Sequence, residues 1–307
     1  MKVVFMGTPE MAVPTLRELV ENDIEVALVI TQTDKPKGRG KQMQAPPVKE
    51  YALEKGIEVI QPKSLKNNDE VLEQLKAIAP DFLVVAAYGK ILPQSVLDTP
   101  KYAPINVHFS LLPKYRGAAP VNWAVIRGEK ETGVATMLMD AGLDTGDILL
   151  VEETPIEKKT ALDIADELSE TGAKLLIKTL KEFDSITPIK QNDDEMTYAP
   201  MMKKEDGCID WSKSADEIEC MIRGFVPWPT AYSTLNGKTV KLFAADVVKA
   251  SDGLSAGEVF DVTKKSFSIK CGEGGLKIKE LQPEGKKRMP VGSFLAGAQL
   301  KGGEKFE

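Results

Sequence analysis

Short apolar runs alternate with helical patterns over the first 150 residues, and this alternation restricts the fold more than any other feature of the sequence. Residues 2–6, 25–30 and 81–87 are apolar on both faces, and the amphipathic stretches 11–21 and 70–79 lie between them. Strands that are buried on both faces and joined through helices form a parallel sheet with helices on each side. The sequence therefore predicts an α/β domain with a Rossmann-like, mostly parallel sheet and helices on both of its faces.

The pattern changes after Phe183. Residues 184–210 have little periodicity and contain several Pro, Asn, Asp and Gly residues, a composition typical of a linker. Beyond residue 211, short strands follow one another at a spacing of roughly ten residues, and Asn236 and Gly237 form a two-residue hairpin signal between two of them. We therefore expect an α/β domain at 1–184, a linker at 185–210 and a small OB-like β-barrel at 211–307.

Cysteine and histidine usage limits the chemistry that this chain can carry. The three cysteines contain no C-x-x-C pair, which argues against a disulfide framework and a cysteine zinc site and fits a reducing cytoplasm. The one histidine, His108, excludes a metal site with several histidine ligands. No apolar run approaches the ~20 residues of a membrane helix, and the N-terminus is typical of a strand rather than a signal peptide. We expect a cytoplasmic protein without a membrane partner and without an obligate protein partner, hence a monomer.

A long basic connection separates the strand at 25–30 from the helix that begins near Val48. It spans about seventeen residues, whereas strand-to-helix loops usually have about 2–6. Residues 34–49 contain five basic residues and one acidic residue, a net charge of +4, although the whole chain carries −6. Length, charge and glycine content together favour a role in binding a polyanion over a merely solvated surface.

Asn106 and His108 lie two residues apart at the end of the predicted strand 104–108. Side chains at i and i+2 of a strand project from the same face, and the carboxyl ends of parallel strands form the edge where such sheets bind ligands. Residues 114–117, with two cations and a glycine, follow directly. An amide and an imidazole are therefore expected side by side at a ligand-binding edge.

A glycine-rich segment holds Asp140, Asp144 and Asp147. Aspartates in such loops often serve turns, but a carboxylate close to Asn106 and His108 would complete an amide, imidazole and carboxylate trio. Such a trio stabilises an oxyanion and moves protons. Because it lacks a strong nucleophile and no G-x-S-x-G elbow is present, it suits direct transfer between two bound substrates. The single glycine after the first strand disfavours a dinucleotide-dependent oxidoreductase.

The motifs around these residues resemble the folate-dependent N-formyltransferases. The similarity rests on the N-x-H-x-S-L-L-P element at 106–113, the following KYRGAAP, and DAGLDTGDIL at 140–149. The GTPEMAV start, the TDKPKGRGK loop, AAYGKILP and the C-terminal IRGFVPWPTAY extend it over nearly the whole chain. The basic loop and AYGKILP are typical of the family members that act on an aminoacyl-tRNA.

This resemblance implies that 10-formyltetrahydrofolate gives its formyl group to the α-amino group of methionine on charged initiator tRNA, without a metal and without a covalent enzyme intermediate. It assigns the catalytic positions to Asn106, His108 and Asp144. The residues that it implies for folate contact are Ser110, Leu111, Leu112, Pro113, Tyr88, Gly89, Ile91 and Leu92. Those implied for tRNA binding are Lys35, Lys37, Arg39 and Lys41, with the C-terminal barrel assisting.

One position departs from the family pattern. Phe109 stands where relatives more often carry a small residue, and as a strand residue it is expected to point away from Asn106 and His108.

Three alternatives remain. The nearest is an N-formyltransferase acting on a nucleotide-linked amino sugar, whose relatives share SLLPKYRG and a similar barrel but lack the basic loop. A glycinamide ribonucleotide formyltransferase is disfavoured, because it needs only the first domain. A tRNA-binding module without catalysis is disfavoured, because such a binder has no use for the Asn106, His108 and Asp144 set.

Overall fold

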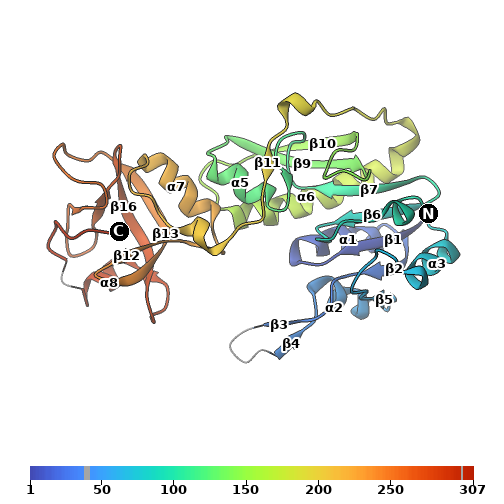
Figure 1. Cartoon of the computed structure of the whole chain (residues 1–307), viewed down its shortest axis with the longest axis horizontal. Helices are drawn as coiled ribbons and strands as arrows, with labels where there is room; N and C mark the ends of the chain where they lie inside the picture. The colour runs from blue at the N-terminus through green and yellow to red at the C-terminus, as the bar shows by residue number, and fades with distance from the viewer. Residues whose placement is uncertain (38–41, 299) are drawn as a thin grey trace. The chain divides into compact units, whose positions relative to one another are not determined.

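The computed structural model describes residues 1–37, 42–298 and 300–307 (Figure 1). The chain forms two compact units, of which the first comprises Met1–Pro120, Thr132–Pro155 and Ala165–Ala199. The second comprises Val121–Glu131, Ile156–Ile164 and Pro200–Glu307. The functional division at residues 184 and 210 stays a prediction.

The first unit contains a seven-stranded sheet, which confirms the predicted α/β architecture. Its strands follow the order β10-β9-β7-β6-β1-β2-β5, and all neighbours from β5 to β7 are parallel, whereas β9 runs antiparallel to β7. The sheet is therefore mostly parallel, as predicted. Its strands are β1 (Lys2–Gly7), β2 (Glu25–Ile30), β5 (Val59–Ile60), β6 (Phe82–Ala86), β7 (Ala103–His108), β9 (Glu131–Leu138) and β10 (Ile148–Pro155).

Helices cover both faces of this sheet, because each central strand is apolar on both sides. Met6 of β1 packs in one apolar cluster with Leu75 of α3 (Asp69–Ile78). On the opposite face, a Cβ on Gly172 of α6 (Ala161–Glu182) would lie 2.9 Å from Val107 and 3.5 Å from Phe109. Phe109 thus points toward α6, as expected for the residue after His108. The remaining helices of the unit are α1 (Val13–Glu21), α2 (Pro47–Glu54) and α4 (Gln94–Leu97).

The long basic connection contains a small hairpin that the sequence did not predict. Strands β3 (Lys35–Lys37) and β4 (Gln42–Gln44) pair antiparallel. Arg39 and Lys41, both predicted to bind tRNA, lie outside the described residues, as does the side chain of Lys37.

The second unit is built on a curled antiparallel sheet of half-barrel form, in agreement with the predicted β-rich C-terminal part. Its strand order is β12-β13-β16-β15-β14, and β17 pairs with β16. Ile218, Leu242, Phe267 and Phe306 lie in its core. The strands are β12 (Ala231–Leu235), β13 (Lys238–Val248), β14 (Val259–Phe260), β15 (Ser268–Lys270), β16 (Gly275–Pro283) and β17 (Met289–Pro290).

The strand-only prediction for residues 211–307 missed the helices of that segment. Helix α7 (Ala215–Gly224) begins at a capping box in which Ser214 and Glu217 satisfy each other's backbone N–H groups. This S-x-x-E signature was readable in the sequence. The other helices of the unit are α5 (Pro120–Ile126) and α8 (Val291–Leu295). Among the described residues, no helix is long and apolar enough to cross a membrane.

Candidate active site

Strand β7 places Asn106 and His108 on the sheet face opposite α6. Asn106 pairs with Val85 of β6, and His108 pairs with Ala135 of β9. Val107, between them, faces α6. Both polar side chains are buried, with exposed fractions of 8% for Asn106 and 5% for His108. A buried amide and a buried imidazole therefore stand together at the carboxyl end of the strand, as the alternation of the strand predicted.

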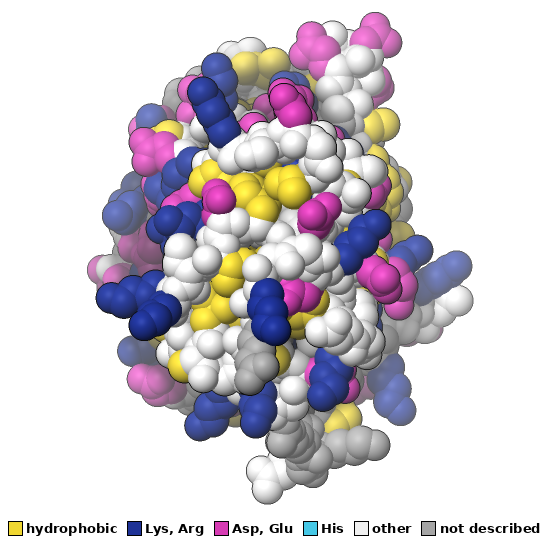
Figure 2. All heavy atoms as spheres, turned by 90° about the vertical axis from the view of Figure 1, so that its left-hand side faces the viewer, with side chains coloured by type: hydrophobic (Ala, Val, Ile, Leu, Met, Phe, Trp, Pro, Cys, Tyr) yellow, Lys and Arg dark blue, Asp and Glu magenta, His cyan; other side chains and the backbone are white. Residues whose placement is uncertain are grey.

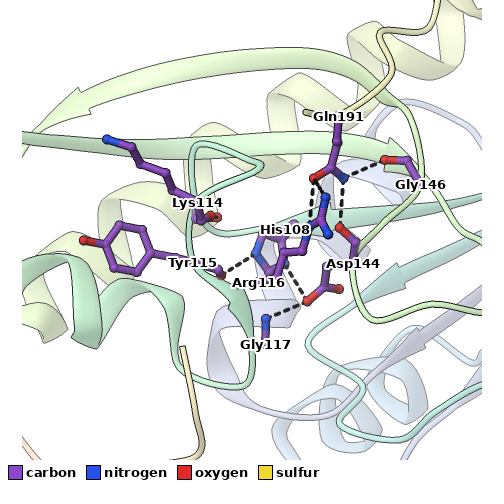
Figure 3. Close-up of polar contacts among 9 residues, drawn as sticks. His108, Lys114, Tyr115, Arg116, Gly117, Asp144, Gly146 and Gln191 are labelled. Atoms are coloured by element: carbon purple, nitrogen blue, oxygen red, sulfur yellow. Dashed lines mark hydrogen bonds and ion pairs between the residues drawn. The ribbon is translucent and has the colours of Figure 1, made fainter. Parts of the chain in front are cut away.

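The imidazole of His108 lies between two oxygen acceptors (Figure 3). Its Nε2 is 3.1 Å from the carbonyl oxygen of Tyr115, and its Nδ1 is 3.7 Å from Oδ2 of Asp144. The first distance is that of a hydrogen bond and the second that of an ion-pair contact. Two acceptors match the two N–H groups of an imidazolium, so this arrangement can accommodate a positive charge on the ring.

Both of these oxygens come from residues in the left-handed backbone region. The φ angle is 62° at Tyr115 and 53° at Asp144. Non-glycine residues in this region cost on the order of 1–3 kcal/mol each and persist only where the surroundings hold them. The two loops beside His108 are therefore held in conformations that the local sequence alone would not favour.

The structure distinguishes Asp144 from Asp140 in the glycine-rich segment. Oδ2 of Asp144 faces His108 and accepts a hydrogen bond of 2.8 Å from the backbone N–H of Gly117. Asp140 instead accepts hydrogen bonds from the N–H of Gly142 and the hydroxyl of Thr145 within its own loop. Asp144 is thus the carboxylate of the predicted trio, and Asp140 serves a turn.

The side-chain amide of Asn106 has no hydrogen-bond partner within the described part of the chain. Because the polar atoms of this amide are not fully buried, a bound substrate can replace solvent as the acceptor of a hydrogen bond from the amide. Asn106 can therefore donate to a developing oxyanion, and a positive charge on His108 would lie on the same face of the strand.

Residues 110–113 follow β7 and form a tight loop. The buried hydroxyl of Ser110 donates a 2.7 Å hydrogen bond to the carbonyl oxygen of Lys114. Leu112 packs in an apolar cluster with Ala135, Met137 and Ile148. The side chains of Ser110 and Leu112 thus support the loop. If this loop contacts a folate, the backbone of these two residues or the neighbouring residues Leu111 and Pro113 would make that contact.

Residues 88–92 follow β6 at the same edge of the sheet. The carbonyl oxygen of Tyr88 accepts hydrogen bonds from Thr8 and Gln32, two residues that sequence reasoning did not single out. A Cβ on Gly89, where φ is +76°, would lie 2.7 Å from Nε2 of Gln32, so this approach requires glycine. Ile91 is exposed, whereas Leu92 is buried.

The Tyr88 ring belongs to the apolar core under this edge, in the same cluster as Leu92. Burial raises the pKa of Tyr88 to about 12. Its hydroxyl therefore stays protonated at neutral pH, and the residue contributes an apolar wall rather than an acid or base for proton transfer.

At the base of the β3–β4 hairpin, Asp34 and Lys49 form an ion pair. The carboxylate of Asp34 accepts hydrogen bonds from Gln61 at 2.7 Å and from Lys49 at 2.9 Å, and these two contacts hold the pKa of Asp34 below its usual value. Lys35, which is exposed, donates a 2.8 Å hydrogen bond to Gln32. Because Asp34 and Lys49 balance each other, the excess positive charge belongs to Lys35, Lys37, Arg39 and Lys41.

Arg116, one of the two cations in the loop after His108, is only 5% exposed. Its guanidinium donates hydrogen bonds to Gln191 and Asp193, in the segment interpreted as a plain linker. Nothing in the local sequence around Gln191 signals this contact. Within the described residues, no group of three or more His, Cys, Asp or Glu side chains could hold a metal ion.

Two family models and several curated relatives match this chain. The family model described as "Formyl transferase" matches residues 1–180, and the model described as "Formyl transferase, C-terminal domain" matches residues 201–299. A methionyl-tRNA formyltransferase of Clostridium novyi is 51% identical over 303 residues, which cover 98% of each chain. One of Citrifermentans bemidjiense is 51% identical over 306 residues, covering 99% of this chain and 95% of the relative.

A solved structure shares the fold at much lower identity. The N-formyltransferase of Helicobacter canadensis, in complex with folinic acid and dTDP-3-aminofucose, aligns with a TM-score of 0.67 at 21% identity and covers 94% of this chain and all of its own. At this identity the likeness speaks for the fold alone.

Proposed function

The chain belongs to the formyl transferase family, as a formyl-transferring enzyme that acts on methionyl-tRNA and uses folate, and we propose that Asn106, His108 and Asp144 carry out the transfer. The formyl donor in this proposal is 10-formyltetrahydrofolate, and the acceptor is the α-amino group of methionine on initiator tRNA. The observation that supports the assignment best is the imidazole of His108 between Tyr115 and Asp144, two residues along the strand from the unpartnered amide of Asn106.

The chemistry follows from the acids and bases at the site. An α-amino group titrates near ~8 in a peptide, and the adjacent ester of the aminoacyl-tRNA lowers its pKa further, so much of the amine is neutral and nucleophilic at neutral pH. Its nitrogen attacks the formyl carbon, a C–N bond forms, and the carbonyl oxygen becomes an oxyanion. The Asn106 amide donates to that oxygen, and one such donor typically contributes about 3–4 kcal/mol to the transition state. The His108 imidazolium, whose two N–H groups face Tyr115 and Asp144, stabilises the same negative charge through its own positive charge.

Collapse of the tetrahedral intermediate completes the transfer. The bond between the formyl carbon and N10 of the folate breaks as N10 takes a proton, while the attacking amine loses one. The Asp144 carboxylate stabilises the imidazolium and, with His108, moves this proton. Holding the amine and the formyl carbon in contact contributes the rest of the acceleration, so no step needs a nucleophilic side chain or a metal.

The folate is proposed to lie at the carboxyl edge of the sheet, between the loop at 110–113 and the segment 88–92. Three features support this place: the exposed apolar side chain of Ile91, the buried wall formed by Tyr88 and Leu92, and the backbone approach allowed by Gly89. These residues lie at the ends of β6 and β7, which are neighbours in the sheet.

The tRNA is proposed to contact the β3–β4 hairpin and the C-terminal unit. Residues 211–307 carry 15 basic and 12 acidic residues, a net charge of +3, in contrast to −9 for residues 1–210. Figure 2, which faces the C-terminal unit, shows Lys and Arg side chains spread over this face among acidic ones, around several apolar patches. Local positive charge of this kind suffices to hold a phosphate backbone.

Removing the hairpin charges is expected to weaken tRNA use selectively. In the variant Lys37→Ala/Arg39→Ala/Lys41→Ala, KM for tRNA should rise and KM for the folate should stay unchanged. In a plot of log kcat/KM for tRNA against the logarithm of the salt concentration, each cation that no longer binds a phosphate should make the slope shallower by about one unit. The matched control is Lys174→Ala/Lys178→Ala, which removes two exposed lysines of α6. An unchanged KM for tRNA in the hairpin variant would refute this role.

A parallel acceptor assay tests the proposed donor and acceptor. Labelled 10-formyltetrahydrofolate is offered with methionyl initiator tRNA, methionyl elongator tRNA, a nucleotide-linked amino sugar and glycinamide ribonucleotide. We expect label on the initiator tRNA. The amino-sugar alternative has only a distant structural neighbour in its favour; label on that compound would establish the alternative instead.

The wider setting of the activity is also proposed. Residues 1–184 act as the catalytic part, 185–210 connect, and 211–307 assist tRNA binding. Charged tRNA is met in the cytoplasm, where we place the protein as a monomer, and sedimentation equilibrium tests that oligomeric state.

A further inference from the structure

Residues 189–199, which we call the strap, lie along both loops that flank His108. At one end, Ile189 exchanges two backbone hydrogen bonds of 2.8 Å with Ile148, just after the Asp144 loop. At the other end, Thr197 accepts hydrogen bonds from the backbone N–H groups of Tyr115 and Arg116, each 2.9 Å long. Strand β11 (Tyr198–Ala199) then pairs in parallel with β8 (Arg116–Gly117). The strap is therefore bonded to both loops.

Gln191 is the side chain of the strap that reaches between these loops, and it is 7% exposed (Figure 3). Its Nε2 donates to the carbonyl oxygens of Asp144 at 2.8 Å and of Gly146 at 2.7 Å. Its Oε1 accepts from Nε of Arg116 at 3.0 Å and from Nη2 at 2.9 Å. A glutamine amide has two N–H donors and two acceptor sites on its oxygen, so all four hydrogen-bonding positions are used.

The two segments that Gln191 joins are the two that fix the Asp144 carboxylate. Arg116 directly precedes Gly117, whose N–H binds Oδ2 of Asp144. Asp144 itself has a left-handed φ of 53°, and such a residue needs surrounding contacts to keep it there. A Cβ on Gly146 would lie 1.9 Å from the carbonyl oxygen of Leu138, so the loop also passes close to β9. The hydrogen bonds from Gln191 provide the contacts that this backbone requires.

We propose that Gln191 is a positioning residue for formyl transfer, which acts by clamping the Asp144 loop to the Arg116 segment and so keeps the Asp144 carboxylate facing His108. The inference rests on the proposed role of Asp144. Gln191 touches neither substrate in this scheme, and its effect on the reaction passes through the position of Asp144. A misplacement of about 1 Å at a catalytic group can lower a rate about 100-fold, so removal of the clamp has a measurable consequence.

Gln191→Leu removes all four hydrogen bonds of the Gln191 side chain. Gln191→Glu keeps an oxygen that accepts from Arg116 but loses the N–H donor to the carbonyl oxygens of Asp144 and Gly146. Both variants are expected to lower kcat by about 10- to 100-fold, with little change in KM for either substrate. If the pairing with Arg116 alone mattered, Gln191→Glu would behave as wild type. The matched control is Asn192→Ala, since among the described residues its side chain hydrogen-bonds only within the strap. It is expected to retain wild-type kcat.

Two readouts separate positioning from mere stabilisation. The protein has a single histidine, so the ring 15N resonances of His108 are unambiguous. Gln191→Leu should shift the Nδ1 resonance in the same direction as Asp144→Asn shifts it. In a double-mutant cycle, Gln191→Leu should cause no further loss of kcat in the Asp144→Asn background, because residues that act as a unit are not additive. If Gln191→Leu fails to fold by circular dichroism, the cycle is run with Gln191→Glu.

The outcomes distinguish this inference from the proposed function. If Asp144→Asn retains wild-type kcat, the proposed role of Asp144 is wrong, and the proposed role of Gln191 is refuted as well. If Asp144→Asn loses activity but both Gln191 variants do not, only the clamp is overturned. Losses that add in the double variant, or an unchanged Nδ1 resonance in Gln191→Leu, also overturn the clamp and leave the catalytic assignment standing.

Discussion

Replacing His108 by alanine is expected to lower kcat by about 1,000-fold or more, because the variant loses both the positive charge that stabilises the oxyanion and a proton-transfer group. KM for folate and for tRNA should change little, since the proposed binding residues are untouched. Single-turnover transfer of labelled formyl measures the chemical step directly. The fold should survive, because the polar contacts of the ring are limited to one with Tyr115 and one with Asp144 among the described residues.

His108→Asn provides the companion measurement. Asparagine can still donate one hydrogen bond but cannot carry a positive charge, so its kcat should lie between those of wild type and His108→Ala. Circular dichroism and thermal unfolding establish that each variant is folded. A folded His108→Ala variant with near-normal turnover would refute the catalytic role of the imidazole.

The second large effect is expected for Asp144→Asn, which removes the negative charge and keeps the shape of the side chain. Asparagine tolerates the left-handed backbone region, so the φ of 53° at this position can persist, and an amide oxygen can still accept from the N–H of Gly117. We expect kcat to fall by about 100- to 1,000-fold. The related change in serine proteases costs about 10,000-fold, and here the 3.7 Å contact with Nδ1 is longer than a hydrogen bond.

The same loop offers a matched control. Asp140 also accepts two hydrogen bonds, but from Gly142 and Thr145, so Asp140→Asn makes the same chemical change without altering the charge next to His108. It should retain nearly wild-type kcat. Equal losses in Asp140→Asn and Asp144→Asn would mean that the loop as a whole, and not the Asp144 carboxylate, supports the reaction.

Much of the fold followed from periodicity. Strand 25–30 has the same bounds in the structure as in the prediction, and strand 104–108 begins one residue earlier, at Ala103. Such segments are predictable because a central parallel strand must be apolar on both faces. Helix α7 was missed because its amphipathic face lies among short strands, although the capping box at Ser214 and Glu217 marked its start. The β3–β4 hairpin has no comparable signal in its polar sequence.

The site was predictable where it depends on strand geometry alone. Asn106 and His108 share a face because alternate residues of a strand always do, and both lie at the carboxyl end of β7. The family motifs pointed to Asp144, but the residue pattern by itself left Asp140, Asp144 and Asp147 as alternatives. The choice among them needs the loop path, which depends on contacts with Gly117 and Gln191.

By itself the sequence determined the class of fold, the mostly parallel character of the sheet, the shared face of Asn106 and His108 and the family. Each of these depends on local periodicity or on motifs that are continuous in the chain. Only the tertiary structure decided which aspartate faces the imidazole, that Arg116 is buried rather than offered to a substrate, and that Gln191 lies 47 residues from Asp144 yet hydrogen-bonds to it. The reason is that a left-handed loop residue is held by contacts between distant segments, and such contacts leave no periodic trace in the sequence.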